Sequence, residues 1–217
     1  MGKRIIGYGR ELKMNEDKSK GLMLRERNIK YKGHRVKVYE DVLESPDGET
    51  LYYDFVENRN GAGVLLVDEE GKLIFVKQYR NSINDFDIEI PAGCAELADY
   101  HNENRNPEEF TRADFESVDN PFYQCAMREA EEETGLIPER LIFVNYIIAS
   151  VGLFSERTAV YIGEGIKSGV INRDSDEFIE IVKLTPEEAE ECIHSGQIND
   201  SKTIIAILAY SRLKSKK

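Results

Sequence analysis

The segment NPFYQCAMREAEEETG, residues 120–135, restricts the possible folds of this chain more than any other. Asn120 is a favourable helix N-cap, Pro121 suits the first helical position, and Gly135 supplies the left-handed residue that ends a helix. The sequence therefore predicts a well-delimited helix over residues 121–134.

The same helix carries three glutamates on one face. Glu129, Glu132 and Glu133 are related by i, i+3 and i+4, while Glu131 points away. Arg128 lies one turn before Glu132 and can orient it. Crowded carboxylates repel unless a cation neutralises them, and hard oxygen ligands select Mg²⁺ or Mn²⁺. The alternative is a solvated acidic face, which is the more common meaning of such a run on spacing alone.

The charge of the chain excludes some partners. With 41 acidic and 29 basic residues, the 217-residue chain has a formal net charge of −12. Nucleic acids and anionic membranes bind proteins with an excess of Lys and Arg, so neither is an expected partner. Residues 1–20 lack the apolar run of a signal peptide, and stretches such as residues 204–210 are too short to span a bilayer. We therefore expect a cytoplasmic protein.

Composition favours an ordinary globular core that is stabilised neither by disulfide bonds nor by a cysteine-bound metal. Apolar residues make up 41% of the chain, which is enough to form a core. Cys94, Cys125 and Cys192 are odd in number and show no CxxC spacing. Neither a disulfide framework nor a zinc–thiolate site is expected.

Hydrophobic periodicity predicts many strands and few helices. Strands are expected at residues 35–43, 50–56, 63–68, 73–78, 86–90, 141–149, 158–163 and 178–184. Two helices are expected after the acidic one, at residues 186–194 and 201–213. Because the helices are too few and too late for a βαβ series, the pattern favours an α+β fold, or a sheet sandwiched by helices.

Breaks in the pattern suggest the domain organisation. The run Asn58-Arg59-Asn60-Gly61 separates an N-terminal extension and β-hairpin domain, residues 1–60, from a larger domain, residues 61–217. Residues 97–120 are polar and acidic with little apolar pattern. We interpret them as a surface insertion that is partly helical around residues 107–115.

Residues 91–136 resemble the signature of the Nudix hydrolases, G-x5-E-x7-R-E-U-x-E-E-x-G-U, in which U is apolar. Gly93 matches the first glycine, and REAEEETGL at residues 128–136 matches the whole second half. The resemblance implies an α/β/α sandwich with a mixed sheet, preceded here by a small antiparallel β domain.

The first half of the signature departs from the family. The five-residue step from Gly93 ends on Asp99, and 28 residues (100–127) then precede Arg128 where the family has seven. Counting back from Arg128 gives Asn120 where the family has Glu. In the family that Glu mainly supports the helix arginine, so here Asp99, Glu116 or neither replaces it.

A narrower resemblance is to the ADP-ribose pyrophosphatase branch. Its segments are similar to QYR at residues 78–80, DIEIPAG at residues 87–93 and GLFSER at residues 152–157. The similarity extends over roughly residues 36–213, and the elements occur in the order found in the family.

The resemblance implies a metal site. The carbonyl of Ala92 and the carboxylates of Glu129 and Glu133 would ligate Mg²⁺, with Glu132 bridging or adjacent, and Mn²⁺ as a possible substitute. Glu132 and Glu133 would thereby take part in catalysis.

The resemblance also implies substrate contacts. Arg80 would bind a phosphate or the terminal ribose, with Glu89 beside it, and Glu156 would contact the sugar. A further acid that positions or deprotonates water maps to Glu177, with Asp174 and Asp176 as neighbours that could substitute.

The implied function is Mg²⁺-dependent hydrolysis of the pyrophosphate bond of ADP-ribose, or a related ADP-sugar, to AMP and a sugar phosphate. A nucleoside diphosphate sugar is the expected substrate, and a homodimer with an exchanged N-terminal element is the expected assembly. N-terminal aromatics stack on adenine in this branch, and the candidates here are Tyr31, Tyr39, Tyr52 and Tyr53. The alternatives are hydrolysis of GDP-mannose or a UDP-sugar, or a non-catalytic nucleotide-binding sensor.

Overall fold

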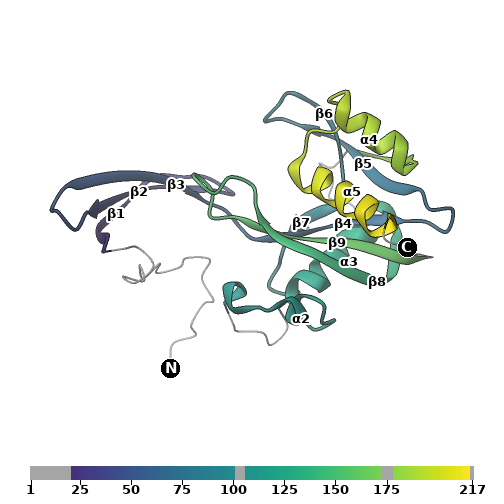
Figure 1. Ribbon diagram of the computed structural model, residues 1–217, viewed down its shortest axis with the longest axis horizontal. Helices are drawn as coiled ribbons and strands as arrows, with labels where there is room; N and C mark the ends of the chain where they lie inside the picture. Colours follow the sequence, from purple (N-terminus) through teal and green to yellow (C-terminus); the bar gives the residue numbers. More distant parts are fainter. Residues whose placement is uncertain (1–20, 101–105, 173–177, 216–217) are drawn as a thin grey trace. The chain divides into compact units, whose positions relative to one another are not determined.

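A computed structural model describes residues 21–100, 106–172 and 178–215 of the chain. The chain divides into two units, each built around its own β-sheet (Figure 1). Of the described residues, the first unit contains 21–59 together with 150–156. The second unit contains the others, from residue 60 to 149 and from residue 157 to 215.

The sheet of the first unit has three antiparallel strands in the order β1-β2-β3, which are Met23–Lys32, Lys37–Glu44 and Thr50–Glu57. On one face Tyr39 stacks on Phe55 with ring centroids 5.1 Å apart, and the Arg27 guanidinium lies over both rings. Arg27 also donates two hydrogen bonds, of 2.7 and 2.6 Å, to Asp41. Aromatic stacking and a bidentate ion pair thus hold β1 and β3 against the central strand.

The sheet of the second unit is mixed. Its main strands run in the order β10-β5-β4-β9-β8, which are Ile179–Leu184, Leu73–Arg80, Gly61–Val67, Arg157–Ser168 and Leu136–Ile148. β4 and β9 pair in parallel, whereas the other pairs are antiparallel. The short strands β6, Asp85–Glu89, and β7, Ala92–Cys94, pair with β5 and β4. Every residue of β4 is buried, as its continuous apolar run requires.

Helices cover both faces of this sheet (Figure 1). One face carries α3, Pro121–Thr134, with the short elements η1, Pro107–Glu109, and α2, Arg112–Phe115. The other face carries α4, Pro186–His194, and α5, Ser201–Lys214. The predicted α+β fold, an α/β/α sandwich with a mixed sheet after a small antiparallel one, is confirmed. In these described ranges no helix has the length and apolar character to cross a membrane.

The caps of α3 agree with the sequence. The Asn120 side chain accepts a hydrogen bond from the Phe122 amide, Pro121 begins the helix, and Gly135 ends it with a φ of 70°. The strands agree less well: the periodicity did not predict β1 or β7, and β8 and β9 are longer than expected. β1 is mostly polar, so its strand character comes from pairing with β2 rather than from an alternating pattern.

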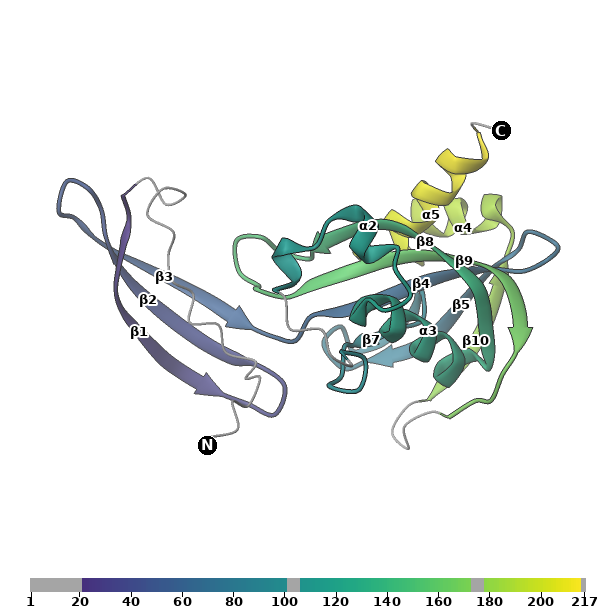
Figure 2. The ribbon, with the colours of Figure 1, turned by 90° about the horizontal axis from the view of Figure 1, so that it is seen from below.

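The inserted segment 97–120 is more than a surface loop. Phe110 and Phe115 belong to the same buried cluster as Phe122 of α3, and Phe115 is the last residue of the short helix α2, whose backbone is drawn in Figure 2. Phe115 stacks on Phe143 of β8 with ring centroids 4.5 Å apart, and its carbonyl accepts a 3.0 Å hydrogen bond from Tyr161. The interpretation of this segment as a purely surface feature is therefore wrong, because two aromatic side chains in it complete the core of the sheet.

Replacing Phe115 with alanine is therefore expected to lower the free energy of unfolding by about 3–5 kcal/mol, since it empties a packed aromatic site. Val118→Ala is the matched control in the same segment, because Val118 is 58% exposed, and it should change the stability by less than about 0.5 kcal/mol. Urea unfolding followed by circular dichroism measures both. Equal, small effects of the two substitutions would show that the insertion does not contribute to the core.

Candidate functional site: a carboxylate helix beside a glycine turn

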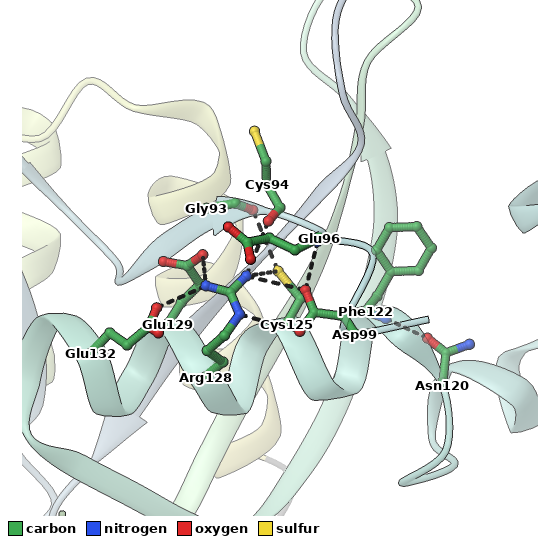
Figure 3. A network of polar contacts seen from close by, with 10 residues as sticks. All are labelled: Gly93, Cys94, Glu96, Asp99, Asn120, Phe122, Cys125, Arg128, Glu129 and Glu132. Atoms are coloured by element: carbon green, nitrogen blue, oxygen red, sulfur yellow. Dashed lines mark hydrogen bonds and ion pairs between the residues drawn. The ribbon is translucent and has the colours of Figure 1, made fainter. Parts of the chain in front are cut away.

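Arg128 of α3 lies at the centre of a network of polar contacts (Figure 3). Its Nη1 donates hydrogen bonds of 2.8 Å to both Glu129 and Glu132. Its Nε and Nη2 donate to the two carboxylate oxygens of Asp99 at 3.2 and 3.1 Å, and Nη2 also donates to the Cys94 carbonyl at 3.1 Å. One guanidinium thus connects two helix carboxylates, the start of the insertion and strand β7.

This network explains how the acidic face of α3 is tolerated. Burial acts to lower the pKa of Arg128, but hydrogen bonds to Asp99 and attraction to Glu129 raise that pKa above its ordinary value. The arginine therefore stays charged and offsets the repulsion between Glu129 and Glu132. The predicted orientation of Glu132 by Arg128 is confirmed.

Asp99 makes the contact that the family resemblance assigns to the first glutamate of the signature. It is 4% exposed, binds Arg128 through both oxygens and also accepts a 2.7 Å hydrogen bond from the Glu96 amide. The other candidate, Glu116, pairs instead with Arg112 on the surface. The sequence left open Asp99, Glu116 or neither, and the structure places Asp99 on the arginine.

The turn after β6 lies against the carboxylate face of α3. Glu133 is 3% exposed, and its Oε2 accepts a 3.2 Å hydrogen bond from the Ala92 amide. A Cβ atom on Gly93 would lie 2.1 Å from Oε1 of Glu129, so only glycine lets this carboxylate approach the turn. The structure thus brings together the predicted metal ligands Ala92, Glu129 and Glu133, with Glu132 on the same helix.

The donor chemistry of this region fits a hard divalent cation. Glu129 and Glu133 lie against a turn that has no side chain at Gly93, and Glu132 lies on the same helix; oxygen donors of this kind suit such an ion. Within the described parts of the chain, no three His, Cys, Asp or Glu side chains already lie close enough to ligate one ion. Instead, Glu129 and Glu132 are bonded to Arg128, and Glu133 is bonded to the Ala92 amide.

Cys125 lies inside the same network without a nucleophilic role. Its Sγ is 3.6 Å from the Gly93 carbonyl oxygen and 3.7 Å from Nη2 of Arg128. Burial, with the negative charges of Glu129 and Asp99, raises the pKa of the thiol well above its ordinary value. A neutral thiol is a weak nucleophile, so Cys125 packs beneath the site rather than reacting in it.

A second charged cluster contains Arg80 and Glu89. Nε and Nη2 of Arg80 donate to the two oxygens of Glu89 at 2.5 and 3.0 Å, and Glu89 also accepts a 2.6 Å hydrogen bond from Lys202. Burial acts to raise the pKa of Glu89, but these two cations lower it to about 2. Burial acts to lower the pKa of Arg80, but Glu89, and to a smaller extent Glu133 and Asp200, raise it above its ordinary value, so the charge of Glu133 on α3 is felt at this cluster.

Lys202 was not among the predicted site residues. It lies in the first turn of α5, whose N-cap is Asp200. A helix N-terminus disfavours cations, so a lysine at this position indicates a nearby carboxylate partner. That signal was available in the sequence, but it could not identify Glu89, which is 113 residues away along the chain.

The other predicted residues belong to the first unit or lie outside the described residues. Glu156 belongs to the first unit, where its Oε2 accepts a hydrogen bond from Asn58 at 2.5 Å. Glu177 lies outside the described residues, as do Asp174 and Asp176. Among the N-terminal aromatics, Tyr39 is stacked on Phe55, whereas a set of three is more than half exposed: Tyr31, Tyr52 and Tyr53.

Substituting Asp99 with alanine is expected to lower the free energy of unfolding by about 3 kcal/mol, because it leaves the partly buried Arg128 without its bidentate partner. Glu116→Ala is the matched control, since it removes an exposed ion pair worth less than about 1 kcal/mol. Thermal or urea unfolding compares the two. The reverse order of effects would assign the supporting role to Glu116.

The ionisation of Glu89 predicts a pH-dependent stability. Its pKa falls from an ordinary 4.5 to about 2 on folding, so its contribution is complete above about pH 4.5 and is lost as the pH falls toward 2. The stability difference between the wild type and Glu89→Gln should therefore be larger at pH 6 than at pH 3, by about 2 kcal/mol. Urea unfolding at both pH values measures it, with Glu70→Gln on the surface as the control. A difference independent of pH would contradict the assignment.

Comparison with known proteins gives the family. The NUDIX domain pattern matches residues 57–204. The chain is 31% identical to the ADP-ribose pyrophosphatase of Bacillus subtilis (strain 168), over 85% of this chain and 89% of that protein. It is 30% identical to the methanol dehydrogenase activator of Bacillus methanolicus, over 86% of this chain and 93% of that protein.

A solved structure agrees on the fold. The crystal structure of an ADP compounds hydrolase matches with a TM-score of 0.70 at 16% identity, covering 90% of this chain and 95% of that chain. The family pattern covers more than half of the chain and includes the turn at Gly93 and the carboxylates of α3. This protein therefore belongs to the Nudix family, as a hydrolase that acts on pyrophosphate bonds.

Proposed function

We propose that this protein hydrolyses the diphosphate bond of ADP-ribose, or of a related ADP-sugar, to AMP and a sugar phosphate in a Mg²⁺-dependent reaction. The observation that carries the proposal is the packing of Glu129 and Glu133 against residues 92–93, with Arg128 holding Glu129 and Glu132. The similarity to an ADP-ribose pyrophosphatase over most of both chains supports the choice of substrate.

The residues of α3 would hold the metal. Glu129, Glu133 and the Ala92 carbonyl are the proposed ligands of Mg²⁺, with Glu132 bridging or adjacent. Mn²⁺ is a possible substitute, because it prefers the same oxygen ligands. When bound, such an ion neutralises diphosphate charge and lowers the pKa of water. The part of Arg128 is to orient two of these carboxylates before any ligand arrives.

Arg80 would bind the diphosphate, with Glu89 holding the guanidinium in place. Glu89 occupies Nε and Nη2 of Arg80, and the side chain of Arg80 is 37% exposed. Its Nη1 has no hydrogen-bond partner among the described residues, so two N–H groups are available to a phosphate oxygen. Glu89 thereby orients Arg80, and Glu156 is the proposed contact of the substrate sugar.

Several finer assignments remain predictions. Glu177 is proposed to position or deprotonate the attacking water. A homodimer with an exchanged N-terminal element, base stacking by the N-terminal tyrosines and a cytoplasmic location are likewise predictions from the sequence.

A second candidate function is binding without hydrolysis. It is favoured by the similarity to a protein named as an activator of methanol dehydrogenase, which is nearly as high as that to the pyrophosphatase. In that case the protein would act as a nucleotide-binding regulator of a partner.

The test is chromatographic product analysis of ADP-ribose, ADP-glucose, GDP-mannose and a UDP-sugar, each with Mg²⁺ and with a chelator. We expect AMP to form fastest from ADP-ribose and only with the metal. Faster turnover of GDP-mannose or the UDP-sugar would overturn the substrate assignment while keeping the metal site. Binding of ADP-ribose with no turnover of any compound would favour the regulator.

Glu133→Gln, assayed in the same way, tests the metal ligands. We expect kcat to fall about 100-fold or more, because the amide supplies a weaker ligand than the carboxylate. Glu131→Gln is the matched control on the other face of α3, since its side chain accepts a hydrogen bond from the Val170 amide and glutamine keeps that acceptor. Full Mg²⁺-dependent turnover by Glu133→Gln would show that the metal assignment is wrong.

A further inference from the structure

Lys202 is a partly buried cation bound to two carboxylates. Its side chain is 17% exposed, and Nζ donates to Oε2 of Glu89 at 2.6 Å and to Oδ1 of Asp200 at 3.0 Å. Asp200 is itself fixed, because its other oxygen accepts hydrogen bonds from the amide and hydroxyl of Thr203. Lys202 therefore occupies a defined position at the start of α5.

The location of Lys202 is unfavourable for a lysine without partners. The N-terminus of α5 repels a positive charge, and burial removes the ammonium from water. Burial acts to lower the pKa of Lys202, but Asp200 and Glu89 raise it above its ordinary value. The ammonium thus remains charged, and its placement depends on these two carboxylates.

Lys202 and Arg80 share one carboxylate. Oε2 of Glu89 accepts from both Nζ of Lys202 and Nη2 of Arg80, while Oε1 accepts from Nε of Arg80. A carboxylate held by one cation can rotate together with it, whereas a carboxylate held by two cations from different elements has one orientation. The plane of the Arg80 guanidinium is therefore set from α5 through Glu89.

The contribution of Lys202 to Arg80 is geometric rather than a gain of net charge. With Asp200 included, the cluster contains two cations and two carboxylates, so the second cation is balanced by a second acid. Lys202 should therefore act by fixing the carboxylate that orients Arg80, without touching the phosphate itself.

We infer that Lys202 is a positioning residue for Arg80, acting through Glu89 to hold the guanidinium ready for the diphosphate of the substrate. This inference rests on the proposed function, and it adds a residue of the opposite helical layer to the substrate site. A lysine that contacted the substrate directly would act independently of Arg80, and this difference makes the inference testable.

The experiment is a double-mutant cycle with Lys202→Met, Arg80→Ala and the double variant, assayed for ADP-ribose hydrolysis with Mg²⁺. Lys202→Met should raise KM about tenfold with kcat changed less than about threefold, and Lys202→Arg should restore most of the loss. In the Arg80→Ala background, Lys202→Met should change KM less than about twofold. Lys183→Met is the control and should leave KM unchanged. It removes an ion pair between Lys183 of β10 and Asp68, which lies in the turn between β4 and β5.

An unchanged KM in Lys202→Met would overturn the inference, as would independent, multiplying effects of the two substitutions. If Lys202→Met does not fold, Lys202→Gln, which keeps a hydrogen-bond donor but not the charge, takes its place in the cycle.

Failure of the proposed function can be distinguished from failure of this inference, because the same variants are also titrated with ADP by calorimetry. If the wild type does not hydrolyse ADP-ribose, a loss of ADP affinity that disappears in the Arg80→Ala background still supports the inference. An unchanged affinity, or no binding of ADP by the wild type, overturns it.

Discussion

The site depends on one arginine that satisfies four other groups at once. Arg128 binds Glu129, Glu132, Asp99 and the carbonyl of Cys94. Without it, the acidic face of α3 would carry neighbouring carboxylates in a partly buried position, which is costly in a low-dielectric environment. The arginine therefore allows a chain of net charge −12 to concentrate acids on one helix and still fold.

The two helical layers contribute to the site through different charges. α3 supplies the carboxylates, and α5 supplies Lys202, whose partner Glu89 lies on β6 between them. Arg80 on β5 has the carboxylates of Glu89 and Glu133 as its electrostatic neighbours. The sheet thus supports both the acidic face of α3 and the ion-pair cluster of Arg80, Glu89 and Lys202.

Local signals were sufficient for the parts of the fold that are encoded locally. Helix α3 begins and ends where Asn120 and Gly135 place it, since capping depends on neighbouring residues alone. These local signals did not predict features that depend on contacts between distant residues. Phe115 stands in a polar segment, and only its packing on β8 makes it a core residue. Counting from Gly93 reached Asp99, but only the contact with Arg128 separates it from Glu116.

The two ends of the insertion are attached to the same helix: Asp99 binds Arg128, and Asn120 caps the first turn of α3. The contact between Asp99 and Arg128 closes a loop that contains residues 100–127, and the entropy of closing a loop grows only with the logarithm of its length. Each doubling costs about 0.6 kcal/mol, so a connection about four times as long as that of the family signature costs little more than about 1 kcal/mol. Burying an aromatic side chain returns more than that. Lengthening at this point is therefore thermodynamically permitted, and new sequence can accumulate next to the site without disturbing it.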